Sequence, residues 1–213
     1  MTKPIDVYWS FRSPYSYLAT PGMLALGRDF DVDVALRVVL PAAIRAPDML
    51  FNPQNAVRAR YIALDWPRRA RFLGMSDRWP RPDPIVQDMT TLKIADEQPY
   101  IYRLSKLGVE AQRRGRGLEF ASEISQLLFG GTRDWHLGAH LADATARAGL
   151  DLAELDAAID NGDHMSEVEA NQQALAAVGQ WGVPTFVFEG EPFFGQDRID
   201  TLRWHLENQG LER

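Results

Sequence analysis

Residues 5–18 read IDVYWSFRSPYSYL, and this stretch decides the fold. Its first half, Ile5–Phe11, is rich in β-branched and aromatic residues, which predicts a strand. Ser13-Pro14 follows and predicts the start of a helix over Tyr15–Gly27, because serine caps free N–H groups and proline is preorganised for the first helical position. A second strand is expected over Val32–Leu40. Together these elements predict a right-handed β-α-β unit with two parallel strands.

The end of the chain returns to strand patterns. Thr185–Glu189 predicts one strand, Gly190-Glu191 a tight turn, and Phe193-Phe194 the start of a second strand. Two strands this close are expected to pair as an antiparallel hairpin. Asp197–Glu207 has apolar residues at helical spacing and predicts a closing helix.

Helical patterns dominate the middle of the chain, from Pro41 to about Gln180. Asp151–Ile159 predicts one of these helices. Ser166–Gln180 predicts another, because Ser166 and Glu169 have the spacing of a capping box.

The order of elements is βαβ, then a helical block, then ββα. This order predicts an α/β protein with a thioredoxin-like fold and a large α-helical insertion domain. We expect the thioredoxin-like domain to comprise residues 1–42 and 178–213, and the insertion to comprise residues 43–177. A chain of 213 residues is long enough to bury such a core without disulfide or metal crosslinks.

Composition excludes several classes of function. The chain has no cysteine, which excludes disulfides, a protein thiol nucleophile and thiolate metal sites. Its net charge of −6 argues against nucleic acid as a partner. No apolar run approaches the ~18 residues of a membrane span, and the first residues lack the pattern of a signal peptide. We therefore expect a cytoplasmic protein that binds neither nucleic acid nor membranes.

One segment is locally basic despite the acidic total. Between residues 58 and 83, seven arginines stand against three acids. These residues form either a solvated helix face or the rim of a pocket that attracts a small carboxylate. The arginines are Arg58, Arg60, Arg68, Arg69, Arg71, Arg78 and Arg81.

Ser13-Pro14-Tyr15-Ser16 lies between the first strand and the first helix, where thioredoxin-type proteins carry Cys-x-x-Cys. A helix N-terminus stabilises an anion, including a thiolate. Ser13 offers a hydroxyl in place of a thiol, so it could donate a hydrogen bond to a thiolate supplied by a ligand. The alternative is that Ser13 is only a helix cap.

Two further motifs lie near the C-terminus. Trp181-Gly182-Val183-Pro184-Thr185 precedes a strand at the position of the cis-proline in thioredoxin-like folds. A cis-Pro184 would leave the backbone N–H and C=O of Val183 free to pair with an extended peptide. The alternative is a simple turn. In Phe194-Gly195-Gln196-Asp197-Arg198, Gln196 and Asp197 could bind the carboxylate and ammonium groups of an amino-acid-like ligand, or Asp197 could be a cap.

His136 and His140 are four residues apart, a spacing that can place two metal ligands on one face of a helix. Two histidines without a third ligand are weak support for a metal site. We therefore expect a surface position for this pair and no metal.

Taken together, the three motifs around Ser13, Pro184 and Gln196-Asp197 resemble those of 2-hydroxychromene-2-carboxylate isomerases and kappa-class glutathione transferases. These proteins belong to the DsbA-like branch of the thioredoxin superfamily. The resemblance covers nearly the whole chain. The stretch Phe120–Leu206 is the most similar, including Asn171 before the Gly182-Val183-Pro184 turn.

The resemblance implies a set of glutathione contacts. Ser13 matches the serine that hydrogen-bonds the glutathione sulfur, and Val183, before Pro184, matches the residue that pairs with the cysteinyl part. Gln196 and Asp197 match the pair that holds the γ-glutamyl end. Arg58 falls near the position of a basic residue beside the glycyl carboxylate.

The sequence departs from the family in one binding segment. The family often carries Gly-Asn-x-Pro-Pro, whereas residues 51–55 read Phe-Asn-Pro-Gln-Asn with shifted spacing, which leaves Asn52 as a doubtful glutathione contact.

The function that the resemblance implies is glutathione-dependent cis–trans isomerisation of an aromatic-degradation intermediate, with an aromatic carboxylate as the substrate and a homodimer as the assembly. A glutathione transferase and a non-catalytic glutathione-binding protein remain as alternatives.

Overall fold

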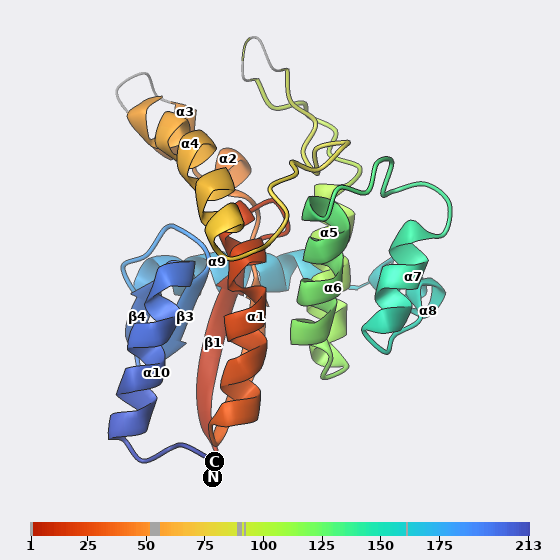
Figure 1. Ribbon diagram of the computed structural model, residues 1–213. Helices are drawn as coiled ribbons and strands as arrows, with labels where there is room; N and C mark the ends of the chain where they lie inside the picture. The colour runs from red at the N-terminus through yellow and green to blue at the C-terminus, as the bar shows by residue number, and fades with distance from the viewer. Residues whose placement is uncertain (1, 52–55, 89–90, 92, 161) are drawn as a thin grey trace.

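The computed structural model describes residues 2–51, 56–88, 91, 93–160 and 162–213 (Figure 1). Four strands form one mixed sheet in the order β2-β1-β3-β4. β1 runs parallel to β2 and antiparallel to β3, and β3 runs antiparallel to β4. The parallel unit and the C-terminal hairpin predicted from the sequence are both confirmed. The strands are β1 Lys3–Trp9, β2 Val32–Val38, β3 Thr185–Phe188 and β4 Glu191–Phe194.

Helices lie on both faces of this sheet, and most of them come between β2 and β3 in the sequence (Figure 1). The predicted α/β thioredoxin-like fold with a helical block between its two ends is confirmed. The α-helices are α1 Pro14–Asp29, α2 Ala42–Arg45, α3 Pro47–Phe51, α4 Ala56–Phe72, α5 Ile101–Arg113, α6 Gly117–Phe129, α7 His140–Arg147, α8 Leu152–Ile159, α9 His164–Ala177 and α10 Ile199–Asn208, and η2 Gln196–Arg198 is a 3₁₀ turn.

The two faces of β1 enter two different clusters, because successive side chains of a strand point to opposite sides. Ile5, Val7 and Trp9 are fully buried in the main hydrophobic core. Tyr8 instead contacts a smaller cluster with Leu175 of α9. The sheet is therefore covered on both faces.

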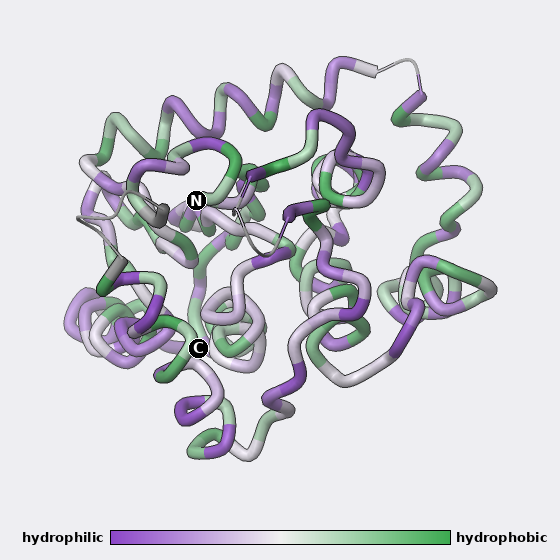
Figure 2. The backbone as a smooth tube through the Cα atoms, turned by 90° about the horizontal axis from the view of Figure 1, so that it is seen from above, coloured by the Kyte–Doolittle hydropathy of each residue, from purple (hydrophilic) through white to green (hydrophobic). Residues whose placement is uncertain are grey.

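α9 crosses behind the sheet, on the side opposite α1 and α10 (Figure 1). Seen from above, it runs along one side of the molecule (Figure 2). Asn171 Nδ2 of α9 donates to the Val38 carbonyl at 3.0 Å, and the Leu40 N–H donates to Gln172 Oε1 at 3.1 Å. α9 therefore holds the end of β2. The proposed domain boundaries stay a prediction.

β2 is the strand at one end of the sheet, and α5 and α6 both pack against it. The Leu36 N–H donates to Gln112 Oε1 of α5 at 2.9 Å, so a side chain takes the place of a neighbouring strand. Gly108 of α5 lies close to Phe11 and Val38, where a larger residue would not fit. The absence of a side chain at Gly108 permits this close approach.

Two sequence-based boundaries at the C-terminal end were wrong. The hairpin turn is Glu189-Gly190, one residue earlier than predicted, and β4 already begins at Glu191. Both turn residues have positive φ, +50° and +85°, as the type I′ turn favoured in short hairpins requires. The closing α-helix begins at Ile199, and Asp197 lies in the preceding 3₁₀ turn instead of capping α10.

The prediction for α9 was also shifted. The helix begins at His164 and not at Ser166, because the His164 imidazole packs against Glu110 of α5, at 2.9 Å from its carboxylate. It ends at Ala177 and does not reach Gln180, since Gly179 takes a left-handed conformation with φ of +76°.

Within the described residues, no helix combines the length and the apolar character needed to cross a membrane.

The close approach at Gly108 makes it a test of the packing between α5 and the sheet. A Cβ at this position would lie 2.7 Å from the buried Phe11 ring. We expect Gly108→Ala to lower the free energy of unfolding by about 1–3 kcal/mol, as overpacked core substitutions do. Gly27→Ala is the matched control, because its Cβ would meet Val34 at an ordinary 3.8 Å. It should raise stability by about 0.5–1 kcal/mol. Urea unfolding measures both, and equal effects would contradict the packing.

The hydrogen bond from Asn171 provides a second test, on the opposite face. Asn171→Ala leaves the buried Val38 carbonyl without this donor, so we expect a loss of about 1–3 kcal/mol in unfolding free energy. Gln173→Ala, an exposed position on the same helix, should change it by less than about 0.5 kcal/mol. The stabilising role of the Asn171 hydrogen bond is refuted if the two variants unfold at the same urea concentration.

Candidate functional site

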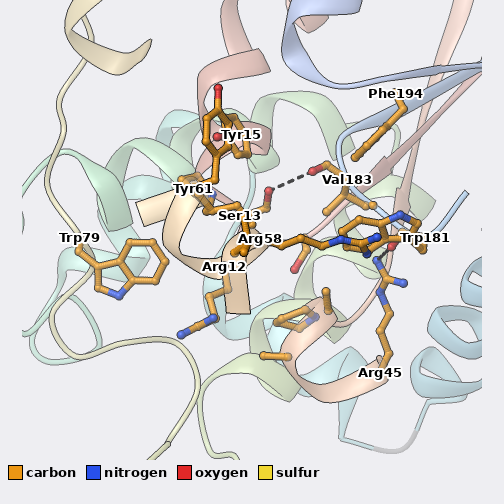
Figure 3. A pocket seen from close by; sticks show the side chains of 18 residues that line it. Arg12, Ser13, Tyr15, Arg45, Arg58, Tyr61, Trp79, Trp181, Val183 and Phe194 are labelled. Atoms are coloured by element: carbon orange, nitrogen blue, oxygen red, sulfur yellow. Dashed lines mark hydrogen bonds between the residues drawn. The ribbon is translucent and has the colours of Figure 1, made fainter. Parts of the chain in front are cut away.

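Ser13 caps α1 and also faces a pocket. Its Oγ accepts a hydrogen bond from the Ser16 N–H at 3.1 Å, and its hydroxyl donates to the Val183 carbonyl at 3.3 Å. The hydroxyl is thus a helix cap, and it also lies within reach of the loop before β3. The Ser13 side chain connects the two segments that sequence analysis had singled out separately (Figure 3).

Ser16 occupies the other end of the Ser-Pro-Tyr-Ser motif, and its position differs from that of Ser13. The Ser16 side chain is completely buried, and its Oγ has no hydrogen-bond partner among the described residues. Ser13, by contrast, lines the pocket. Of the two serines, Ser13 is therefore the one that a ligand can contact.

The Val183-Pro184 peptide bond is cis, as predicted from its position before β3. The prediction that both Val183 backbone groups would be free was wrong for the carbonyl, which accepts the Ser13 hydroxyl. The Thr185 hydroxyl donates to the Gly182 carbonyl at 2.8 Å, and the Gly195 N–H donates to the Pro184 carbonyl at 2.9 Å. The bond from Ser13 ties this loop to the N-terminus of α1, and the other two join it to β3 and to the end of β4.

A pocket of about 650 Å³ opens at this point, a volume typical of small-molecule sites. Its walls come from the N-terminal turn of α1, from α2 and α4, and from the loop before β3. Aromatic rings stand on both sides of Ser13 (Figure 3). The lining residues are Ser10, Arg12, Ser13, Pro14, Tyr15, Pro41, Ala42, Ala43, Arg45, Val57, Arg58, Tyr61, Ile62, Trp79, Trp181, Gly182, Val183 and Phe194.

Trp79 forms one wall of the pocket, and polar contacts fix its position. Its indole N–H donates to Asp83 at 3.0 Å. The same carboxylate accepts two hydrogen bonds from Arg12, at 2.7 and 2.8 Å, and the Arg12 guanidinium lies 5.2 Å from the Trp79 ring centre. The charge of Arg12 is therefore balanced inside the protein.

Trp181 forms the opposite wall, and two arginines flank it. The Arg58 guanidinium lies 5.5 Å from the centre of its ring. Arg45 donates from Nη2 to the Trp181 carbonyl and from Nε to the Leu40 carbonyl, the latter at 2.8 Å. Burial lowers the pKa of Arg45 to about 10, so its side chain is still charged at neutral pH.

The two tyrosines of the pocket share one carboxylate. Tyr15 donates to Asp65 at 2.8 Å, and Tyr61 donates to the other oxygen of Asp65 at 3.2 Å. Burial, and then the hydrogen bond to Asp65, raise the pKa of Tyr15 well above its usual range. The Tyr15 phenol is therefore neutral at physiological pH and cannot serve as a base.

The structure brings together three of the residues that sequence analysis assigned to the site. Ser13, Val183 and Arg58 all line the pocket. The Pro184 carbonyl is bonded to Gly195, and Asn52 lies outside the described residues.

Gln196 and Asp197 lie beyond the pocket lining. Gln196 Oε1 accepts a hydrogen bond from Arg69 at 3.3 Å. Asp197 pairs with Arg198 at 3.2 Å, and its half-exposed carboxylate contributes to the raised pKa of Tyr15. The pair is therefore near the rim of the site, and its role in binding stays a prediction.

The basic segment between residues 58 and 83 has no single role. Arg58 lines the pocket, whereas Arg71 lies on the surface, 3.6 Å from Asp77.

His136 packs against the rings of Tyr100 and Trp135. The described residues contain no group of three or more potential metal ligands.

Sequence analysis missed Arg12, Arg45 and Trp79. Arg12 directly precedes Ser13, and Trp79 begins the proline-rich stretch 79–84, so both had a local signal. Arg45 had little local signal in the sequence. It lies at the site because α2 places it against the Trp181 carbonyl.

Comparison with known proteins agrees with this architecture. The sequence matches the model of the DSBA-like thioredoxin domain over residues 4–207. No match was found among curated protein sequences. Several solved structures, however, share the fold.

One similar structure is a 2-hydroxychromene-2-carboxylate isomerase, at 19% identity and a TM-score of 0.64 over 97% of this chain and 95% of that one. A second is a probable DsbA oxidoreductase from Streptomyces coelicolor, at 18% identity and a TM-score of 0.64 over 97% and 89%. A third is the cytosolic disulfide reductase DsbM from Pseudomonas aeruginosa with GSH, at 16% identity and a TM-score of 0.55 over 96% and 99%. The family model spans nearly the whole sequence, and the protein therefore belongs to the DsbA-like thioredoxin domain family.

Proposed function

We propose that this protein binds glutathione beside Ser13 and uses its thiolate to isomerise a conjugated, aromatic-degradation intermediate. One observation carries the proposal. The N-terminus of α1, beside a cis-proline, bears a serine, and the chain contains no cysteine at all. A thiol at this site must therefore come from a ligand.

The chemistry of the site suits a thiolate ligand. The positive end of the α1 dipole favours an anion, and the Ser13 hydroxyl can turn from the Val183 carbonyl toward a sulfur atom. That hydrogen bond is long at 3.3 Å, so it costs little to exchange. The Val183 carbonyl would then be available to the backbone of the ligand. Similar proteins support the choice of ligand, since the Pseudomonas reductase is recorded with GSH.

The reaction that we propose needs no other reactant. The glutathione thiolate adds to one carbon of a conjugated double bond, and the electron pair moves to the conjugated carbonyl. The former double bond is now single and rotates. Loss of the thiolate re-forms it in the other geometry, so glutathione is regenerated. The apolar, aromatic walls suit a planar substrate, and the similar fold of the isomerase supports this reaction class.

Three related expectations remain proposals. Gln196, Asp197 and Arg58 would bind the two ends of glutathione. The protein would act in the cytoplasm, where glutathione keeps thiols reduced. It would form a homodimer, which sedimentation analysis tests directly.

The first test is the pKa of the bound glutathione thiol, followed by thiolate absorbance against pH. We expect binding to lower it from about 8.5 by roughly two units. Ser13→Gly removes the hydroxyl at a cost of only a few tenths of a kcal/mol in helix capping, so it should reverse much of that fall without unfolding the protein. Ser13→Ala should act similarly but also cost about 1 kcal/mol of stability.

Ser16→Ala is the matched control, because it removes a buried hydroxyl three residues away in the same helix. The thiol pKa should stay as in the wild type. The role of Ser13 would be refuted if Ser13→Gly and Ser16→Ala gave the same pKa. If glutathione does not bind at millimolar concentration, the cofactor proposal fails. Binding with an unshifted thiol pKa would instead indicate a non-catalytic binding protein.

A second test separates isomerase from transferase. With a cis-configured, conjugated aromatic carboxylate in excess, a trace of glutathione should sustain many turnovers, because each cycle returns it. Chromatography after the reaction should recover unmodified glutathione. A transferase would instead consume one glutathione per product and accumulate the thioether. That result would contradict the proposed isomerisation and identify the reaction as conjugation.

A further inference from the structure

α4 exposes a row of apolar side chains on the face turned away from the core. Trp66 and Ala70 of this helix are buried, whereas four apolar residues on the opposite side are open to solvent. Because a helix repeats every 3.6 residues, their sequence spacings of four, three and eight place them in one row. A continuous apolar row marks a contact surface, unlike a single exposed residue. The members of this apolar stripe, with their exposed fractions, are Val57 (76%), Tyr61 (58%), Leu64 (63%) and Phe72 (75%).

The apolar stripe also carries positive charge. Arg68 lies in the row between Leu64 and Phe72, and Arg60 borders it. Both arginines are exposed, and neither forms an ion pair with a residue that the structure describes. They are eight residues apart, which is about 12 Å along a helix. α4 as a whole has five arginines and one aspartate in a chain of net charge −6, so an acidic and apolar partner suits it.

α10 exposes a surface of the opposite charge. Trp204 is 60% exposed, and Asp200 and Glu207 lie one turn before and after it on the same face. Both acids are exposed, and within the described part of the chain neither pairs with a cation. Their separation of seven residues is about 10 Å, close to that of the two arginines. Each helix thus presents two unpaired charges with an apolar side chain between them, Leu64 on α4 and Trp204 on α10.

The two helices belong to one face of the molecule. α4 and α10 both pack against α1. In Figure 1, α10 lies alongside α1, and α4 rises from its upper end. The Arg69 side chain of α4 donates to Gln196, in the turn before α10, at 3.3 Å. A face with a basic half and an acidic half complements itself across a two-fold axis, because rotation brings each half opposite the other.

We propose that two copies of this chain form a dimer through this face, with α10 of each copy lying on the apolar stripe of the other. Trp204 of the partner subunit packs against Leu64, and the two acids beside it lie opposite Arg60 and Arg68. The apolar contact removes exposed side chains from water, and the charges fix the orientation of the two helices.

The dimer contact also reaches the pocket. Val57 and Tyr61 belong both to the apolar stripe and to the pocket lining, so the partner's α10 lies beside the pocket mouth. The homodimer proposed above is the basis of this inference, which assigns the surface that forms it. Glutathione is not required, because protein side chains alone make the contact.

Exchange of the charges tests the contact. One variant carries Arg60→Glu and Arg68→Glu, and the other carries Asp200→Lys and Glu207→Lys. Sedimentation of the full chain without ligand measures the dimer dissociation constant. Each variant alone sets like charges against each other at both contacts, so the constant should rise at least about tenfold. An equimolar mixture should recover most of the wild-type affinity, because every contact then joins opposite charges.

A matched pair of substitutions tests the apolar part. Leu64→Glu puts a charge in the middle of the apolar stripe and should raise the dissociation constant at least about tenfold. Leu137→Glu is the control, since Leu137 is similarly exposed at 57% but lies between α6 and α7. Its constant should stay within about twofold of the wild-type value. If a charge-exchange variant does not fold, this pair decides the outcome.

The surface is refuted if the wild type dimerises with a constant that the α4 and α10 variants leave unchanged, or if the mixture of folded variants recovers no affinity. A wild type that stays monomeric at roughly 100 μM overturns both the surface and the homodimer. If that monomer bound phosphatidylserine vesicles and Leu64→Glu abolished the binding, the stripe would dock on an anionic membrane instead. Failure of the proposed isomerisation has a different signature: glutathione would not bind, although the dimer and its charge dependence remained.

Discussion

The first turn of α1 carries backbone N–H groups that the helix itself cannot satisfy. In α1 the Ser16 N–H donates to Ser13 Oγ and the Tyr17 N–H donates to the Ser13 carbonyl, so Ser13 caps this end of the helix with both groups. β1 lies inside the sheet and leads directly to this helix end. The loop before β3 is bonded to it, because the Val183 carbonyl accepts the Ser13 hydroxyl. The positive end of a helix is thus placed at the wall of an apolar pocket, where partial charges act strongly.

The two sides of this pocket differ in charge balance. On one side, Asp83 neutralises Arg12 and orients Trp79, so this wall is aromatic and its charges cancel. On the other side, Arg45 and Arg58 flank Trp181 without a described acid.

Residues of α9 and of α2 both hold the segment after β2, which lies next to this site. The Leu40 N–H is held by Gln172 of α9, and the Leu40 carbonyl is held by Arg45. Arg45 in turn reaches Trp181. The segment after β2 therefore connects the rear helix to the loop that carries the cis-proline.

The sequence by itself determined the β-α-β start, the C-terminal hairpin and the cap at Ser13. Each of these depends on local signals: alternating apolar residues, a serine before a proline, and a short turn between aromatic strands. Only the tertiary structure decided that α9 begins at His164, where packing against Glu110 adds residues to the helix. It also decided which arginine is part-buried at the pocket. Arg45 stands in a four-residue helix with no periodic pattern, and its role follows from a contact with a residue 136 positions away, which no local signal can indicate.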